Sequence, residues 1–213
     1  MPGTLGVLLA GGAGSRLALG VPKALVPLGG VTLLARGVAI LAAVCEEVVV
    51  TAPAALEPAL AGTLGGMGET RARFRTDGPT ARAGPLAGLV AGLTAAPFER
   101  AVVLAVDLPF VPPALLETLL ARLGAHHAVI PVPGGFPQPL AAAYAPEAAA
   151  ILARCLAAGE HAPTRALGSL DALRLDDETL AGLPGGVDGF FNLNTRDDLA
   201  AAERRLSARE ARR

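Results

Sequence analysis

The sequence predicts an α/β protein with an open, mainly parallel β-sheet. Two observations favour this class: short, continuous apolar runs recur along the chain, and longer apolar stretches with helical spacing separate them. Runs without polar alternation are typical of parallel strands that are buried on both faces. Because such strands alternate with helices of roughly 10 to 15 residues, we expect βαβ units with right-handed crossovers and helices on both faces of the sheet.

Each expected element is supported by its own pattern. The first strand is an apolar run that ends in glycines, and the helix that begins at Pro113 has a proline in its first turn, where an N–H group would be unpaired anyway. Beyond Leu170 the pattern weakens until a final helix. The expected strands are 5–10, 48–50, 101–106, 128–130 and 138–144, and the expected helices are 33–44, 86–96, 113–123, 146–158 and 195–207.

The chain is expected to form one domain. Its 213 residues contain no repeat, linker or low-complexity segment, and this length is compatible with one large domain. The charged residues at its end, 203–213, are interpreted as a tail that finishes in a solvated, fraying end.

The composition excludes several classes of protein. Hydrophobic residues make up 52% of the chain, so it can bury a large core and is not intrinsically disordered. A formal net charge of -1 gives no field that would attract nucleic acid. Cys45 and Cys155 are too few and too far apart for a disulfide scaffold, which indicates a reducing compartment. Lys+Arg come to 18, yet Lys23 is the only lysine.

A membrane location is not expected. The longest stretch without a charged residue or histidine, 128–146, contains several prolines and a pair of glycines, which a spanning helix would not tolerate together. The N-terminus lacks the basic region of a signal peptide. We therefore expect a cytoplasmic protein.

Ligands of open α/β sheets bind beyond the carboxyl ends of the strands, and the first strand ends in an unusual segment. Leu9 to Arg16 read Leu-Ala-Gly-Gly-Ala-Gly-Ser-Arg, and Lys23 follows shortly afterwards. A glycine-rich turn lets N–H groups converge on an anion because no Cβ blocks the approach, and a lysine adds a mobile charge. The spacing matches neither a Walker A loop nor a dinucleotide fingerprint. Tight packing is the alternative explanation for the glycines alone.

Asp107 closes a second strand that is otherwise apolar. A carboxylate there costs several kcal/mol of desolvation if it is unpaired, so it should be exposed in a ligand cleft or bound to a cation. Mg²⁺ typically uses one or two carboxylates together with substrate phosphates, so one aspartate is enough. The alternative, a cap for the helix at Pro113, is weak because Asp107 lies six residues upstream of it.

A third unusual segment starts at Asp77 and opens into the helix expected from Leu86. The first turn of that helix should offer free N–H groups to an anion. A plain Asp-Gly-Pro turn is the alternative interpretation.

Taken together, these segments resemble the molybdenum cofactor guanylyltransferases, the MobA family. The glycine-rich start with a downstream lysine is shared by nucleotidyltransferases that activate sugars, isoprenoid precursors and cofactors. The further segments similar to family motifs, in the same order, are Gly-Pro-Leu-Ala-Gly at 84–88, Asp-Leu-Pro-Phe at 107–110, Gln-Pro-Leu at 138–140 and Phe-Asn-Leu-Asn-Thr at 191–195. The resemblance covers 5–199. It implies a three-layer Rossmann-like nucleotidyltransferase fold with a nucleotide half at about 1–125 and an acceptor half at about 126–200.

The resemblance also implies roles for individual residues. Lys23 would contact phosphate, Asp107 would be the Mg²⁺ ligand, and Arg16 is a further catalytic candidate. Gln138, Asn192 and Asn194 fall in motifs associated with the pterin side of the site and its closing. The implied nucleotide-side positions are Leu9, Ala10, Gly11, Gly12, Gly14, Lys23, Asp77 and Asp107.

Two departures leave the base specificity open. The segment 17–22 ends in Pro22-Lys23, which looks more like the cytidylyltransferases of isoprenoid synthesis or the sugar nucleotidyltransferases. Thr51 stands where the family often has an asparagine that contacts the nucleotide.

The implied activity is transfer of GMP from GTP to the phosphate of molybdopterin, with release of pyrophosphate and with Mg²⁺, or Mn²⁺ in its place, as cofactor. Transient contact with molybdenum-insertion or molybdoenzyme proteins is a further implied partnership. The alternatives are transfer to another phosphorylated acceptor and an idle nucleotide-binding partner in cofactor assembly. His126, His127 and His161 lie outside all these motifs, so no histidine base is expected.

Overall fold

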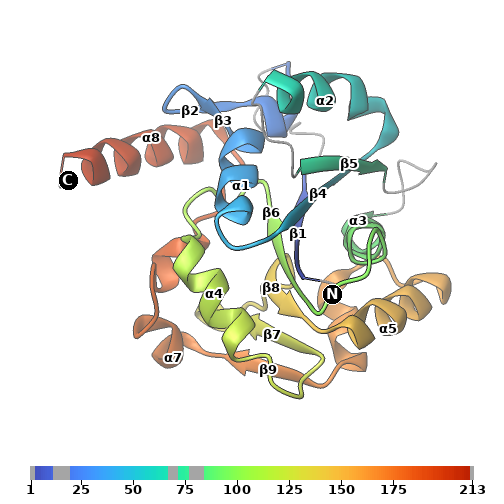
Figure 1. Ribbon diagram of the computed structural model, residues 1–213. Coiled ribbons are helices and arrows are strands. Elements are labelled where there is room, and N and C mark those ends of the chain that lie inside the picture. Colours follow the sequence, from blue (N-terminus) through green and yellow to red (C-terminus); the bar gives the residue numbers. More distant parts are fainter. Residues whose placement is uncertain (1–2, 12–19, 67–71, 77–83, 212–213) are drawn as a thin grey trace.

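The computed structural model describes residues 3–11, 20–66, 72–76 and 84–211. At its centre is a seven-stranded sheet in the order β5-β4-β1-β6-β8-β7-β9 (Figure 1). Within the described residues, β8 is the only strand of this sheet that pairs antiparallel to its neighbours. The strands are β1 (Thr4–Leu9), β4 (Glu47–Ala52), β5 (Ala72–Thr76), β6 (Arg100–Ala105), β7 (Ala128–Pro131), β8 (Ala141–Tyr144) and β9 (Ala172–Leu175), and a separate hairpin is formed by β2 (Pro27–Leu28) and β3 (Val31–Thr32).

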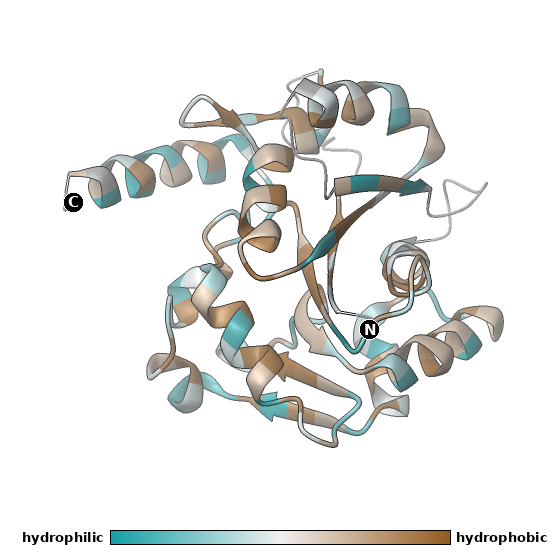
Figure 2. Ribbon diagram, viewed as in Figure 1, coloured by the Kyte–Doolittle hydropathy of each residue, from teal (hydrophilic) through white to brown (hydrophobic). Residues whose placement is uncertain are grey.

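Helices cover both faces of the sheet. Successive residues of a strand alternate between two hydrophobic clusters, so that Leu8 and Val50 lie in one and Val7 and Val49 lie in the other. The central strands are accordingly apolar on both faces (Figure 2). The first cluster is completed by α1 (Leu33–Ala42), α2 (Glu57–Gly66), α4 (Pro113–Ala121), α7 (Asp177–Ala181) and α8 (Arg196–Glu210), and the second by α3 (Gly84–Leu93), α5 (Pro146–Ala157) and α6 (Pro163–Ala166).

This architecture confirms the predicted three-layer α/β class with a mainly parallel sheet. The strands expected at 48–50 and 101–106 are observed at 47–52 and 100–105. The elements that the sequence did not reveal include the edge strands β5 and β9, in which exposed residues interrupt the apolar run. A strand at the edge of a sheet has only one neighbouring strand to bury it, so its pattern is weaker. The division into a nucleotide half and an acceptor half stays a prediction.

The strand expected at 138–144 is wrong in its first part. Residues 138–140 form a turn instead, closed by the Ala141 N–H, which donates to the Gln138 carbonyl at 3.0 Å. The buried Tyr144 hydroxyl donates to the Pro139 carbonyl at 2.7 Å and fixes the same turn. Gln138 therefore lies in the loop before β8 and not within a β-strand.

The final helix is longer than expected, because α8 continues to Glu210 instead of ending near Ser207. The guanidinium of Arg205 lies 4.3 Å from the centre of the Phe191 ring, and that of Arg209 lies 4.8 Å from the centre of the Phe110 ring. A cation over an aromatic face is attracted by the ring quadrupole. The solvated end expected from Arg209 onward therefore starts with an exposed arginine that still contacts an aromatic ring, whereas Arg205 lies within the expected helix.

None of the helices in the described ranges is long and apolar enough to cross a membrane.

The tight packing of α3 on the sheet gives a stability prediction. A Cβ on Gly92 would overlap the side chain of Val7, a buried β-branched residue of the central strand β1. We expect Gly92→Ala to lower the free energy of unfolding by about 1–3 kcal/mol, as overpacked cores do. Unfolding in urea measures this change in the free energy of unfolding.

Gly62 supplies the matched control. It lies in α2, and a Cβ there would meet no atom within 4 Å. Gly62→Ala should raise the free energy of unfolding by about 0.5–1 kcal/mol, because alanine loses less backbone entropy in a helix. Equal effects of the two substitutions would contradict the packing argument.

Candidate active site

The carboxyl ends of the central strands bring the glycine-rich turn and Asp107 to one edge of the sheet. The Val106 N–H donates to the Leu9 carbonyl at 3.0 Å, and the Ala10 N–H donates to the Thr51 carbonyl at 2.8 Å. These bonds continue the parallel pairing of β1 with β6 and β4 just beyond the ends of the strands. The glycine-rich turn after β1 and the Asp107 segment after β6 therefore lie next to each other, as expected for strand ends on one side of a sheet.

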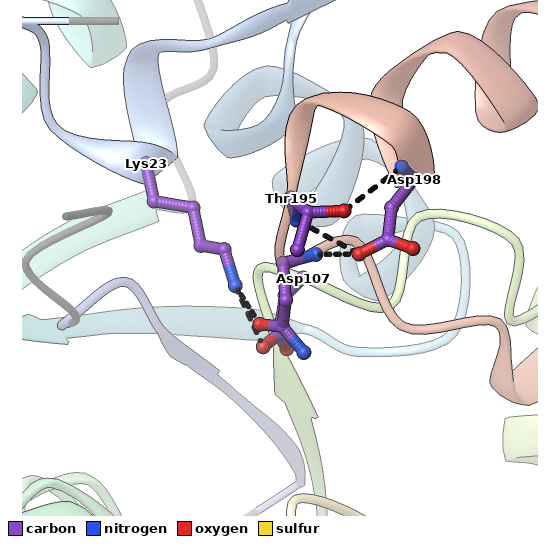
Figure 3. A network of polar contacts seen from close by, with 5 residues as sticks. Lys23, Asp107, Thr195 and Asp198 are labelled. Carbon is purple, nitrogen blue, oxygen red and sulfur yellow. Dashed lines mark hydrogen bonds and ion pairs between the residues drawn. The ribbon is translucent and has the colours of Figure 1, made fainter. Parts of the chain in front are cut away.

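Lys23 enters this edge from a short 3₁₀ helix, η1 (Lys23–Leu25), which follows Pro22. The neighbouring Ala24 is fully buried and anchors the turn in the core. Lys23 itself is only 8% exposed. Its ammonium Nζ lies 3.1 Å from Asp107 Oδ2, so the one lysine of the chain is paired with the predicted cation-binding carboxylate (Figure 3).

Asn194 is the second partner of the ammonium. Lys23 Nζ donates to Asn194 Oδ1 at 2.6 Å. The backbone next to Asn194 is fixed as well, since the Leu193 N–H donates to the Asp107 carbonyl at 2.9 Å and the Leu193 side chain is fully buried. Lys23, Asp107 and the Leu193-Asn194 segment thus form a closed ring of contacts from three distant parts of the chain.

A capping box at the start of α8 supports this ring. Asp198 Oδ2 accepts the N–H groups of Asn194 at 2.9 Å and Thr195 at 2.8 Å, and Thr195 Oγ1 accepts the Asp198 N–H at 3.1 Å (Figure 3). The bond from the Asn194 N–H is the main cause that lowers the pKa of the Asp198 carboxyl, and the positive charge of Lys23 adds to it. Asp198 is therefore an anion near neutral pH.

An open groove of about 430 Å³ lies between η3 (Pro133–Gly135) and η5 (Val187–Phe190), and Phe191, three residues before Asn194, is part of its lining. Phe136, which is 73% exposed, lines the groove together with Gln138. Gln138 is held by its backbone N–H, which donates to the Pro131 carbonyl at 2.8 Å, and by its side-chain amide, which donates to the Phe136 carbonyl at 3.3 Å. The other lining residues are Pro133, Gly134, Val187, Asp188, Phe190, Phe191 and Arg205.

The structure does not bring all predicted site residues together. Asn194 reaches Lys23, whereas Asn192 is exposed and is not among the residues that line the groove. The side chains of Leu9 and Ala10 are buried in the core, so only their backbone groups could serve a ligand, and Gly11 is exposed. Four further predicted positions lie outside the described residues: Gly12, Gly14, Arg16 and Asp77.

The helix after the Asp77 segment differs from its prediction. α3 begins at Gly84, whose φ of 71° lies in the left-handed region, and the Leu86 N–H donates to the His161 carbonyl at 3.4 Å. The expectation that the first turn offers only free N–H groups is therefore wrong for Leu86.

The residues present fit a magnesium ion that is bound largely through its substrate. Within the described ranges, no group of three or more His, Cys, Asp or Glu side chains could hold a metal ion. Mg²⁺ does not need such a cage, because it keeps waters and substrate phosphates as ligands. Asp107 has a side chain that is 23% exposed at the sheet edge, so it can supply the one carboxylate required.

The Cys45 thiol and the His126 and His127 imidazoles have structural environments away from this site. Burial raises the pKa of the Cys45 thiol to about 12, with a smaller contribution from Glu46, so this thiol is not a nucleophile near neutral pH. His126 Nδ1 lies 3.1 Å from Asp171 Oδ2, and His127 Nδ1 accepts the Asp171 N–H at 3.0 Å. The two histidines thus fasten the start of β7 to the segment before β9.

A family model described as the MobA-like NTP transferase domain matches residues 6–173. The chain belongs to this family. A molybdenum cofactor guanylyltransferase from Rhodobacter capsulatus is 36% identical over 204 residues, covering 94% of this chain and 95% of the relative. A probable molybdenum cofactor guanylyltransferase from Natronomonas pharaonis is 34% identical over 203 residues, covering 95% of this chain and 98% of the relative.

Solved structures share the fold. The molybdopterin-guanine dinucleotide biosynthesis protein A from Archaeoglobus fulgidus is 31% identical, with a TM-score of 0.78, and the match covers 96% of this chain and 99% of that one. The 2-C-methyl-D-erythritol 4-phosphate cytidylyltransferase from Thermus thermophilus is 21% identical, with a TM-score of 0.67. The match covers 96% of this chain and 98% of that one, and at this identity it shows the fold alone. The resemblance inferred from the sequence motifs is thereby confirmed, as is the nucleotidyltransferase fold.

Two residues of this region, Asp198 and Phe136, were not expected from the sequence. Asp198 had a detectable signal, because Thr195-Arg-Asp-Asp198 has the spacing of a capping box just before the final helix. No sequence signal distinguishes Phe136, since its exposure results from the turn that places it at the rim of the groove.

Proposed function

We propose that this protein transfers GMP from GTP to the phosphate of molybdopterin and releases pyrophosphate. The observation that carries the proposal is the Lys23 ammonium, held between Asp107 Oδ2 and Asn194 Oδ1 at the carboxyl edge of β1 and β6. A buried cation next to a carboxylate at that edge suits a ligand that brings both phosphates and Mg²⁺. The names of the full-length relatives supply the nucleotide and the acceptor.

The chemistry needs no general base. The acceptor is a phosphate monoester with a second pKa of about 6, so it is largely a dianion near neutral pH. One of its oxygens attacks the α-phosphorus of GTP, a new P–O bond forms, the bond from that phosphorus to the oxygen bridging to the β-phosphate breaks, and pyrophosphate leaves. The barrier arises from repulsion between the anions, which positive charge and in-line positioning lower.

Each residue of the ring has a part in this step. Lys23 neutralises phosphate charge, Asn194 orients its ammonium, and Asp107 would hold Mg²⁺. When bound, Mg²⁺ supplies further charge neutralisation on the phosphates. The family resemblance implies further contacts with the nucleotide, and we include them in the proposal. They come from the phosphate loop with Gly12, Gly14 and Arg16, from Asp77, and from the backbone at 9–11.

The groove between η3 and η5 is the place we assign to the pterin. Phe136 offers an exposed aromatic face for stacking on a flat heterocycle, and Gln138 offers an amide at the same rim. The groove adjoins Phe191, from which the chain continues directly to Asn194 and the phosphate site. We place the reaction in the cytoplasm, with transient transfer of the product to molybdenum-insertion or molybdoenzyme proteins.

The test is a GTP-dependent mass increase of purified molybdopterin when the protein and Mg²⁺ are added, with Mn²⁺ compared in place of Mg²⁺. Pyrophosphate release is measured in parallel with GTP, CTP and ATP. Release from CTP or ATP with a sugar phosphate or another cofactor precursor would point to a different acceptor. GTP binding without pyrophosphate release from any acceptor would indicate an idle assembly partner and would overturn the proposal.

Removing either charge of the Lys23–Asp107 pair should abolish most of the turnover. We expect Lys23→Ala and Asp107→Ala each to lower kcat by several orders of magnitude, on the order of 10³-fold, because each removes a preorganised charge from the transition state. Circular dichroism should show that both variants remain folded. Near-normal turnover of Asp107→Ala would contradict its assignment to Mg²⁺.

The kind of positive charge at position 23 should matter as well. Lys23→Arg keeps the charge, but a planar guanidinium cannot occupy the compact, buried site between Asp107 and Asn194. We expect kcat to fall by about tenfold or more. Initial rates of pyrophosphate release measure this fall in kcat. A fully active arginine variant would show that any cation suffices at position 23.

Phe136 should affect the acceptor and not the nucleotide. We expect Phe136→Ala to raise KM for molybdopterin by roughly tenfold, as the loss of one stacking contact would, while KM for GTP stays unchanged. Val31→Ala is the control, because Val31 is an exposed apolar residue of the β2–β3 hairpin that does not line the groove. A rise in KM for both substrates would place the pterin elsewhere.

A further inference from the structure

We propose that Asp198 is a positioning residue of the active site, which holds the backbone at Asn194 so that the Asn194 amide aims the Lys23 ammonium. The kinetic part of this inference rests on the proposed function, and the structural part does not. Asp198 itself touches neither Lys23 nor Asp107 through any hydrogen bond, so its effect passes through Asn194.

The geometry goes beyond an ordinary helix cap. In a capping box, the carboxylate of the third helical residue accepts the N–H of the cap residue. Here Asp198 Oδ2 accepts the N–H of the cap residue Thr195 at 2.8 Å and also the N–H of Asn194, one residue earlier, at 2.9 Å. The second bond is not needed to begin α8. It fixes the residue whose side chain accepts from Lys23 Nζ at 2.6 Å.

Asn194 is held from both sides. On its N-terminal side, the Leu193 N–H donates to the Asp107 carbonyl, and the Leu193 side chain is fully buried. On its C-terminal side, Asp198 is the partner that the structure gives to the Asn194 N–H. Removing the Asp198 carboxylate would leave the Asn194 backbone free to turn about the Leu193 anchor, and the amide oxygen would lose its fixed direction.

The charge of Asp198 favours the same arrangement. Its pKa is lowered mainly by the bond from the Asn194 N–H, and the attraction between its carboxylate and Lys23 contributes. Lys23 therefore lies in the field of a second carboxylate besides Asp107.

The chain offers two matched controls. Asp197 lies in the same first turn of α8 and contributes the same charge near the positive end of the helix, but the Asn194 N–H bonds to Asp198 and not to Asp197. Asp176 caps α7 by accepting the Thr179 N–H at 3.0 Å, far along the chain from the ring. Asp197→Ala reports the loss of charge, and Asp176→Ala reports the loss of a helix cap.

The single lysine allows a direct readout. The full chain labelled with [ζ-¹⁵N]lysine carries one labelled side chain, Lys23, so its NMR signal reports the ammonium without ambiguity. We expect Asp198→Ala to shift this signal and to speed its hydrogen exchange with water by roughly tenfold, because the bond to Asn194 becomes intermittent. Asp197→Ala and Asp176→Ala should leave the signal as it is in the wild type.

Kinetics supply the second readout. We expect Asp198→Ala to lower kcat by roughly tenfold at saturating GTP and acceptor, as a misplaced catalytic group does. Asp198→Asn should recover most of the loss, since one amide oxygen can accept both N–H groups. Asp197→Ala and Asp176→Ala should stay within about twofold of the wild type, in keeping with surface changes remote from the chemistry.

The outcomes separate the two proposals. A Lys23 signal and a kcat in Asp198→Ala that match those of Asp197→Ala would overturn the positioning role. Should Asp198→Ala fail to fold, Asp198→Glu decides by the same two measurements, because glutamate keeps the charge and a capping-box residue at this position but moves the carboxylate relative to the Asn194 N–H. A shifted Lys23 signal with reduced kcat in this variant supports the role, and wild-type values of both overturn it. If the wild type transfers no GMP, a change of the Lys23 signal confined to the Asp198 variants still supports positioning, while the proposed function fails.

Discussion

The burial of one ammonium group constrains much of this molecule. Lys23 is only 8% exposed, and a buried charge without partners costs several kcal/mol. Its compensation comes from Asp107 and Asn194, which are remote from it in the chain. Three parts of the chain must therefore meet at one edge of the sheet: the end of β6, the segment before α8 and the turn η1.

That convergence also explains why part of the site could be predicted. The positions of Lys23 and Asp107 follow from a general rule, because strand ends carry the ligand-binding residues of open α/β sheets. Two apolar strands that end in a glycine turn and in an aspartate were visible in the sequence, and their pairing follows from the sheet. Asn194 was visible only through the family resemblance, since an asparagine in a loop has no pattern that identifies its partner.

The remaining features depend on contacts that leave no local pattern. The edge strands β5 and β9 are half exposed and lack an apolar run, so only their pairing with β4 and β7 defines them. Neither the contact of Arg205 with Phe191 nor that of Arg209 with Phe110 could be expected from the sequence, because each joins residues more than ten positions apart. The helix α8, which starts two residues after Asn194, therefore contacts these two rings through its arginines.

The fold itself does not select a nucleotide. Lysine, aspartate and a glycine-rich turn act on phosphates, which are common to all nucleoside triphosphates, and a cytidylyltransferase has the same architecture. Selection must therefore come from residues that do not act on the phosphates. Thr51, the second-last residue of β4, carries a hydroxyl that has no hydrogen-bond partner among the described residues, a costly state for a polar group only 1% exposed.

The groove that we propose for the acceptor is connected through the chain to Lys23. Phe191 borders the groove, and Asn194 holds Lys23, so one short segment runs from one half of the site to the other. The Asp198 cap lies at the end of that segment and the Arg205–Phe191 contact near its start. Both of these contacts come from α8, so this one helix fixes the segment that joins the groove to Lys23.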